Sequence, residues 1–190
     1  MPQLQLPIET ERLTIRTLRG SDLTELFEIQ SRPEVARYMY WAPRSSEATR
    51  RWLTLAIPVP SWAVENEALT LAAVERSSGR LAGTLTLFLR SLEHRQGEIG
   101  FMFHPDFQGR GLASEGAREL LQIGFEDLGL HRLYGRCDGR NLASARLMAR
   151  LGMRQEARLV QNEMVKGEWT DEWIYAILGS EWRLRQGLEP

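Results

Sequence analysis

Residues 97–115 constrain the fold of this chain more than any other stretch. Apolar residues alternate with their neighbours over 100–103, which predicts a strand, and Pro105-Asp106 ends it. From Ala113 onward apolar residues recur at helical spacing. Between strand and helix lies the glycine-containing segment 108–113. Because glycine lets backbone N–H groups converge at a helix N-terminus, we expect this loop to bind an anion.

The spacing of residues within the loop separates three kinds of anion site. A P-loop requires Lys followed by Ser or Thr where this chain has Leu112-Ala113, and a dinucleotide fingerprint requires a third glycine where it has Ser114. What remains is Gln-x-x-Gly-x-Ala, formed by Gln108, Gly111 and Ala113. The alternative is an ordinary glycine turn in front of a helix.

Composition narrows the classes of partner and chemistry. The chain has 190 residues and a formal net charge of −1, so bulk electrostatics favours neither a nucleic-acid nor a membrane partner. Cys137 is the one cysteine, which excludes an internal disulfide, and the histidines lack metal-ligand spacing, so we expect no metal. Without a signal peptide or an apolar run of spanning length, a cytoplasmic location is expected.

The remaining patterns predict an alternation of strands and helices. The order of strand, loop, helix and strand over 97–138 is a β-α-β unit, for which parallel pairing is expected. Residues 38–43 form an aromatic loop, and with the early helices they are expected over one side of a cleft, where Trp41, Trp52 and Trp62 serve as lining or as core. We expect strands at 11–18, 68–75, 80–90, 97–104, 133–138, 153–165 and 169–178, and helices at 23–30, 45–55, 113–128, 141–151 and 181–186.

The loop Gln108-x-x-Gly111-x-Ala113 resembles the pyrophosphate loop of GNAT-superfamily N-acetyltransferases. Segments 9–16, 141–144, 149–153 and 167–175 resemble further motifs of that family, and together they resemble its Rim-type branch, the ribosomal-protein N-terminal-alanine acetyltransferases. The resemblance implies an α/β (α+β) fold in one domain over residues 1–190, with its core at 9–179. It also implies a mixed, mostly antiparallel sheet of six to seven strands with a splayed parallel central pair, about four flanking helices, and a possible homodimer.

The resemblance implies acetyl-CoA as the co-substrate. Its pyrophosphate is expected at the loop amides, and the edge of the strand over 101–104, which carries a bulge in the family, is expected to pair with the pantetheine arm. A backbone N–H near Met102 or Phe103 would polarise the thioester, and Asn141 would hold the arm. The cofactor-binding residues are thus Phe101, Met102, Phe103, Gln108, Gly109, Arg110, Gly111, Leu112, Ala113, Ser114, Asn141 and Ser144.

Three carboxylates are candidates for the general base. The resemblance favours Glu163; Glu98 is second, acting through water; and Glu115 complements the helix dipole. The resemblance also implies a role for Ser144, which matches the Rim-type serine proposed to protonate or hydrogen-bond the sulfur that leaves with CoA. The plain structural alternatives are a solvated strand residue for Glu163 and helix capping for Asn141 and Ser144.

An amine that attacks the thioester directly must first be neutral. Neutralising a lysine with pKa ~10.4 at pH 7 costs about 4–5 kcal/mol, whereas an α-amine near ~8 costs only about 1 kcal/mol. This difference favours an α-amine, and the Rim-type resemblance implies that it is the N-terminal α-amine of a ribosomal protein. Two alternatives keep the reaction type: the acceptor is a small-molecule amine, or the transferred group is a larger acyl group. Two others are non-enzymatic: a sensor that binds acyl-CoA without turnover, and a nucleotide-binding module.

Overall fold

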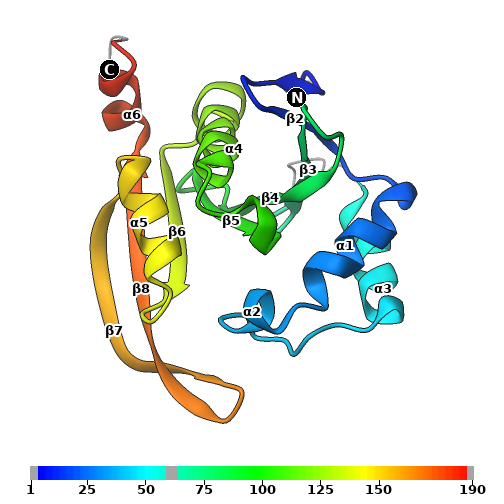
Figure 1. Ribbon diagram of the computed structural model, residues 1–190. Helices are drawn as coiled ribbons and strands as arrows, with labels where there is room; N and C mark the ends of the chain where they lie inside the picture. The colour runs from blue at the N-terminus through cyan, green and yellow to red at the C-terminus, as the bar shows by residue number, and fades with distance from the viewer. Residues whose placement is uncertain (1–3, 59–63, 188–190) are drawn as a thin grey trace.

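The computed structural model describes residues 4–58 and 64–187 and contains one twisted sheet that runs through the chain (Figure 1). Its eight strands lie in the order β1-β2-β3-β4-β5-β6-β8-β7. The sequence predicted six to seven strands, and the short β1 at the sheet edge was not expected. The strands are β1 (Ile8–Glu9), β2 (Leu13–Thr17), β3 (Ala68–Glu75), β4 (Leu81–Ser91), β5 (Gln96–Phe103), β6 (Arg132–Asp138), β7 (Arg154–Val165) and β8 (Glu168–Leu178).

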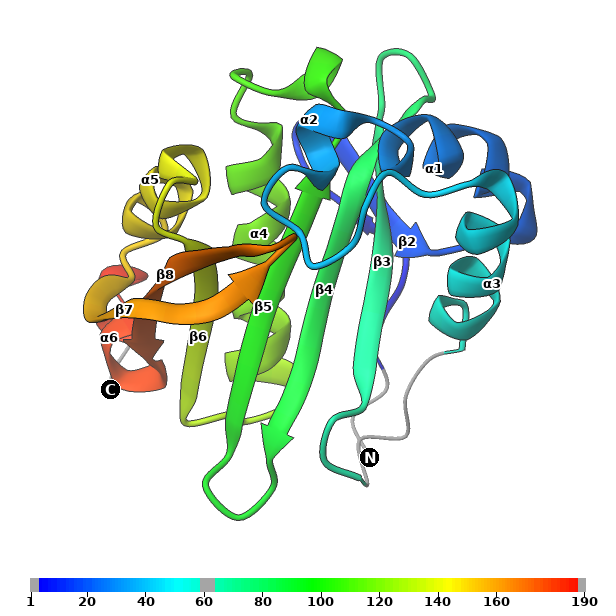
Figure 2. The same ribbon diagram turned by 90° about the horizontal axis from the view of Figure 1, so that it is seen from below.

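Helices cover both faces of the sheet (Figure 2). The first helices pack on one face and α4 and α5 on the other, so two hydrophobic cores form, one on each side. None of the helices in 4–58 and 64–187 is long and apolar enough to cross a membrane. The α-helices are α1 (Leu23–Gln30), α2 (Pro33–Ala36), α3 (Ser46–Ala56), α4 (Leu112–Gln122), α5 (Leu142–Arg150) and α6 (Gly179–Arg185), and a π-helical turn, η3 (Ile123–Asp127), continues α4.

Alternating residues of the central strands serve the two cores. On β4, Leu85 and Leu87 are fully buried on the α4 side, and the space that a Cβ at Gly116 of α4 would need is filled by Leu85. Thr84 and Thr86 face the side covered by the early helices, where they line a cavity. The period-2 pattern of the sequence therefore places packing on one face and polar lining on the other.

The parallel pair β5–β6 parts halfway along its length. The two strands are in register only from Gln96↔Arg132 to Glu98↔Tyr134, although β5 continues to Phe103. The parallel pairing and splay expected from the sequence are thus present. The bulge expected over 101–104 is absent from the β4–β5 pairing, which is regular along that stretch and shifts instead at Leu89/Ser91.

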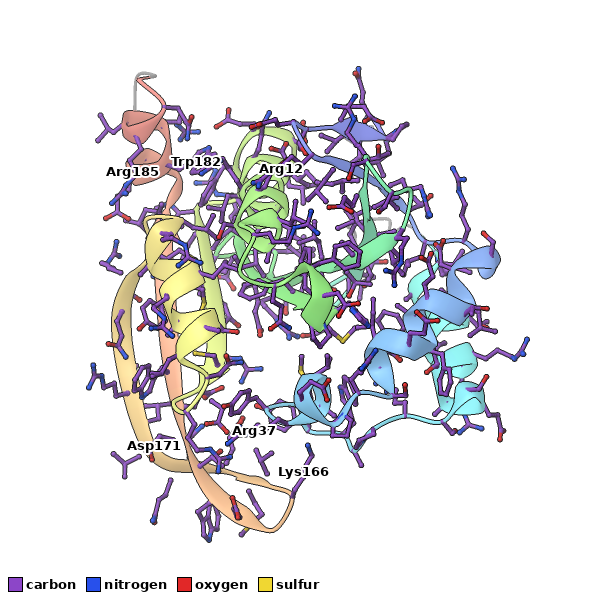
Figure 3. All side chains as sticks on the ribbon, in the orientation of Figure 1. Arg12, Arg37, Lys166, Asp171, Trp182 and Arg185 are labelled. Atoms are coloured by element: carbon purple, nitrogen blue, oxygen red, sulfur yellow. The ribbon has the colours of Figure 1, made fainter. Side chains whose placement is uncertain are left out.

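The long β7–β8 hairpin curves beneath the splay and reaches α2 (Figure 1). Lys166 at its turn donates hydrogen bonds to the carbonyls of Ala36 and Arg37, and Figure 3 shows Lys166 and Arg37 on the same side of the molecule. The hairpin and the early helices therefore enclose the open end of the β5–β6 pair from below.

Replacing Leu85 with alanine should lower the free energy of unfolding by about 2–5 kcal/mol, because it leaves a cavity between β4 and α4. Urea denaturation measures this change. The control Leu55→Ala removes the same atoms from a side chain that is 81% exposed and should change stability by less than about 0.5 kcal/mol. Equal effects of the two substitutions would contradict the assigned core.

Candidate active site

A cavity of about 560 Å³ opens where β5 and β6 part. Its walls come from the end of β5, the loop before α4, the start of α5 and the segment around α2. Most of the predicted cofactor residues line it together, although they are far apart in sequence: Phe101, Met102, Phe103, Gln108, Gly109, Gly111, Ala113, Ser114, Asn141 and Ser144.

The glycine loop presents free backbone donors to this cavity. Gly109 and Gly111 adopt left-handed conformations with φ of 72° and 81°, which favour glycine, and Gly111 is the N-cap of α4. The Gln108 side chain donates to the Phe103 carbonyl at 2.9 Å and ties the loop to the end of β5. In the described part of the chain, no amide from Gly109 to Gly111 donates to a backbone carbonyl. With the first-turn amides of α4, they form a cradle suited to an anion.

A charged clamp behind the loop holds this shape. Arg12 donates to the Arg110 carbonyl at 2.7 Å and to Glu115 at 2.7 Å. Glu115 also accepts hydrogen bonds from the Thr10 hydroxyl at 2.6 Å and the Arg12 amide at 2.8 Å. Although burial opposes it, these donors hold the pKa of Glu115 below its ordinary value of 4.5. Glu115 thus anchors the N-terminal strand to α4 and has a structural role.

Two predicted loop residues point their side chains away from the cavity. Arg110 pairs with Glu75, and Leu112 is buried in the core, so any contact they make with the anion comes from their backbone. Arg150 at the end of α5, which was not singled out as a site residue, lines the cavity instead, with its guanidinium 3.4 Å from the Ser114 hydroxyl. A cation beside the anion loop is therefore supplied by α5.

The register of β5 determines which of its amides face the splay. The His104 amide donates to Ala82 on β4 at 2.9 Å, and N–H groups alternate in direction along a strand. The Met102 N–H therefore faces β4, whereas the N–H groups of Phe101 and Phe103 face the side left open by β6. Of the two oxyanion donors considered from sequence, this geometry favours Phe103.

His104, which follows β5, is buried with 2% of its surface exposed. Its Nδ1 accepts from the Asp106 amide at 3.2 Å, so the side chain caps the turn after β5. The tight turn at Pro105-Asp106 folds back over the imidazole, which explains why a residue at a strand end is buried.

Asn141 and Ser144 both lie at the start of α5. The Asn141 side chain accepts from the Ser144 amide at 3.1 Å, so Asn141 is the helix cap, as the structural alternative proposed. The Ser144 hydroxyl lines the cavity and makes no hydrogen bond to the described residues. It is therefore free to meet a group bound there.

Glu98 and Glu163, the two candidate bases, meet on one guanidinium. Arg136 of β6 donates to Glu98 at 3.1 Å and to Glu172 at 2.8 Å, and lies 3.7 Å from Glu163. Burial opposes the charge of Arg136, but Glu98 and Glu172 outweigh it and raise its pKa. Glu98 also accepts from Arg90 at 2.8 Å, so Glu163 is the less firmly paired of the two candidates.

Tyr40 links Glu163 to the segment after α2. Its hydroxyl donates a short hydrogen bond to Glu163, and partial burial together with that carboxylate raises the pKa of Tyr40. The preceding residue, Met39, lines the cavity. Glu163 itself is not among the residues that line the cavity.

Comparison with known proteins assigns the family. Residues 12–154 match the model of the acetyltransferase (GNAT) domain. The chain belongs to the GNAT acetyltransferase family. It is 31% identical to uncharacterized N-acetyltransferase YnaD of Bacillus subtilis (strain 168) over 92% of this chain and 98% of that protein, and 27% identical to putative ribosomal N-acetyltransferase YdaF of the same organism over 90% and 94%.

Solved structures agree with this GNAT assignment. A GNAT-family acetyltransferase from Bacillus anthracis has a TM-score of 0.82 and 30% identity, with 92% of this chain and 99% of that chain covered. Spermidine N-acetyltransferase from Vibrio cholerae, solved with CoA and spermine, shares the fold with a TM-score of 0.76 and 22% identity over 91% and 99%. The GNAT chain is thus an acyl-CoA-dependent N-acetyltransferase.

The residues present fit acetyl-CoA. The free loop amides and Arg150 suit its phosphates, the open edge of β5 suits its amide-bearing arm, and the Ser144 hydroxyl suits its sulfur. No group of His, Cys, Asp or Glu in residues 4–58 and 64–187 is arranged to hold a metal ion. Trp62, which the sequence predicted as cleft lining or core, lies outside the described residues.

Sequence reasoning did not single out Arg136, Glu172 or Tyr40 as site residues. Arg136 lies two residues after Tyr134 on β6, so the strand period predicts that the two share a face of the sheet but does not predict their partners. Glu172 is 5% exposed, and a buried carboxylate requires a partner. The same strand also carries Glu168 and Asp171, so the sequence alone does not distinguish the buried carboxylate from the exposed ones.

Replacing Glu115 with glutamine should lower the melting temperature at pH 7, because the carboxylate accepts three hydrogen bonds in the folded protein. Since its pKa is lower folded than unfolded, the contribution is complete above the unfolded value and is lost as pH falls through the folded one. The difference from wild type, followed by calorimetry, should therefore shrink between about pH 5 and pH 3. The exposed control Glu11→Gln should show no such trend, and a pH-independent difference would contradict the clamp.

Proposed function

We propose that this enzyme acetylates the α-amine of a protein N-terminus, as the Rim-type branch does, by direct attack on acetyl-CoA in a ternary complex. The contact that carries this proposal joins Tyr40 to Glu163. It ties a carboxylate to the segment whose Met39 lines the same cavity as the glycine loop and Ser144. The ribosomal relative at 27% identity supports the same choice of acceptor.

Each group then has one task. Loop amides from Gly109 to Ser114 hold the pyrophosphate, and the outward amides of β5 align the thioester, with Phe103 donating to its carbonyl oxygen. Glu163 accepts the proton from the attacking amine, and Ser144 hydrogen-bonds the sulfur as it leaves. Arg136 and Tyr40 keep Glu163 in position.

The free-energy cost of obtaining a neutral amine favours an α-amine acceptor. An α-amine with pKa near ~8 needs only about 1 kcal/mol to be neutral at pH 7, against about 4–5 kcal/mol for a lysine. A positioned base contributes about 10²–10⁴-fold, which is adequate for the first of these acceptors.

Two alternatives make different predictions about the acceptor and about turnover. A small-molecule amine is favoured by the spermidine N-acetyltransferase of Vibrio cholerae, whose structure holds spermine in the same fold. A sensor that binds acyl-CoA without turnover would use the same loop, and acyl-CoA would release no free CoA thiol in the presence of any amine. The homodimer and the cytoplasmic location remain predictions.

Replacing Glu163 with glutamine should lower kcat about 10²–10⁴-fold at neutral pH, because the amide cannot accept the amine proton. The deficit should shrink as pH approaches the amine pKa, since the acceptor is then already neutral. The test is the rate of CoA thiol release from acetyl-CoA between pH 6 and pH 10, with a peptide whose N-terminal residue is alanine as the acceptor.

Glu168→Gln is the matched control on the same hairpin, because that exposed carboxylate pairs only at the surface with Arg140. It should leave the profile unchanged. If Glu163→Gln lowers kcat by the same factor at every pH, Glu163 is not the general base.

Replacing Arg150 with glutamine should weaken CoA binding about 10- to 100-fold, because a charge-assisted contact to phosphate is lost. Calorimetry at two salt concentrations measures it, and wild type should show the steeper salt dependence. Arg146→Gln removes the same charge from the exposed side of α5, outside the cavity lining, and should bind CoA normally. Equal affinities for both variants would place the phosphates elsewhere.

A further inference from the structure

A second cavity of about 210 Å³ adjoins the acyl-CoA cavity. The two share Met39, Phe101 and Met102 in their linings, so they meet at the end of β5 where the thioester is expected. The second cavity lies on the side of the sheet covered by the early helices, with Thr86 and Phe88 of β4 forming its floor. Its volume is below the roughly 300–1,000 Å³ of sites for drug-sized ligands, so it suits a group about the size of an amino-acid residue.

The polar end of this second cavity is formed by Gln30 and Arg44. Gln30 is fully buried and lines the cavity, and its Oε1 accepts from the Arg44 guanidinium at 3.0 Å. That hydrogen bond fixes the orientation of the amide. The Gln30 Nε2 group is buried and has no hydrogen-bond partner. A buried N–H donor without an acceptor costs free energy, which an oxygen atom bound in the cavity would relieve.

Arg44 adds a positive charge beside that unfilled donor. Its guanidinium lies over the ring of Trp41 at 4.5 Å and that of Trp52 at 5.6 Å, so its plane is held in place. In the part of the chain that the structure describes, it forms no ion pair with a carboxylate. Burial lowers its pKa, as expected for a cation that lacks a counter-charge. A guanidinium fork next to an amide N–H₂ matches the two oxygens of a carboxylate.

The surroundings disfavour a polycation in the same place. Among the described residues, those that line the second cavity include no acidic side chain. The nearby carboxylates of Glu98 and Glu172 are bound by Arg136, and Glu163 is bound by Tyr40. A second ammonium group of a polyamine would therefore face Arg44 without a counter-charge, at an energetic cost.

We propose that the acceptor amine carries a carboxylate, which binds Arg44 and Gln30 while the amine lies at the junction of the two cavities near Met39 and Glu163. The inference rests on the proposed amine acetylation and specifies its substrate class. The carboxylate belongs either to a free amino acid or to an acidic side chain next to a peptide α-amine.

Matched acceptors separate these sources. Alanine is compared with alaninamide, and an amidated peptide beginning Ala-Glu with one beginning Ala-Gln; spermidine is the polycation. Binding to the CoA-loaded protein is measured by tryptophan fluorescence, since Trp41 and Trp52 line the cavity, and turnover by thiol release. We expect the carboxylate member of one pair to bind about 10- to 100-fold more tightly than its amide twin. The pair that shows the preference identifies the source.

Arg44→Gln should reduce that preference to about twofold without changing the affinity for CoA, which also reports that the variant is folded. Gln30→Glu supplies Arg44 with an internal counter-charge at nearly unchanged volume and should abolish the preference in the same way. Arg51→Gln, an exposed arginine of α3 that pairs with Glu47, should retain it.

Equal binding within both pairs, tighter binding of spermidine, or an unaltered preference in Arg44→Gln would overturn the proposal. If the carboxylate acceptor binds more tightly than its amide twin but no acceptor causes release of CoA thiol from acetyl-CoA, the carboxylate site is supported and the proposed acetyl transfer is refuted.

Discussion

The parting of β5 from β6 beyond Glu98 and Tyr134 is the constraint on which the rest of the site depends. Two parallel strands that stay paired leave no free amides, whereas this pair exposes one edge of β5 from Ile99 to Phe103. The free edge needs a hydrogen-bonding partner, and an extended, amide-bearing arm provides one. The helix that must connect two parallel strands begins beyond the end of β5, so its N-terminus and glycine loop lie at the mouth of the same opening.

The splay also explains the charged network below it. Side chains that a paired sheet would pack together instead face a gap, and three carboxylates from β5, β7 and β8 surround the Arg136 guanidinium. Burial raises the pKa of Glu172 in spite of Arg136, whereas Glu98 has Arg90 as a second cationic partner. Glu163 accepts from the Tyr40 hydroxyl and lies 3.7 Å from the guanidinium, so it is the least firmly paired of the three carboxylates.

Features encoded locally were predictable from the sequence. The glycine loop, the β-α-β unit and the Asn141 cap depend on neighbours in the chain, and the structure contains all three. Features that depend on register were not. The choice between Met102 and Phe103 follows from the hydrogen bond of His104 to Ala82, and the short β1 depends on pairing with β2 rather than on its own pattern.

Contacts between distant segments were the hardest features to predict from the sequence. Glu163 stood out from its place on the penultimate strand, but its partner Tyr40 is more than a hundred residues away in a loop without periodic pattern. Arg44 and Gln30 likewise show their chemistry only when α1 and the loop after α2 fold over the same face of β4 and β5. Neither the spacing of these residues nor the composition of the chain indicates such contacts.

Residue-resolved amide hydrogen exchange, with and without acetyl-CoA, tests the role of the splayed strand and its loop most directly. We expect slower exchange for the amides of 109–114 and for those of Phe101 and Phe103, with little change at Met102, whose N–H faces β4. Unchanged exchange throughout the loop, or protection at Met102 and not at Phe103, would contradict the placement of the acyl carrier between β5 and β6.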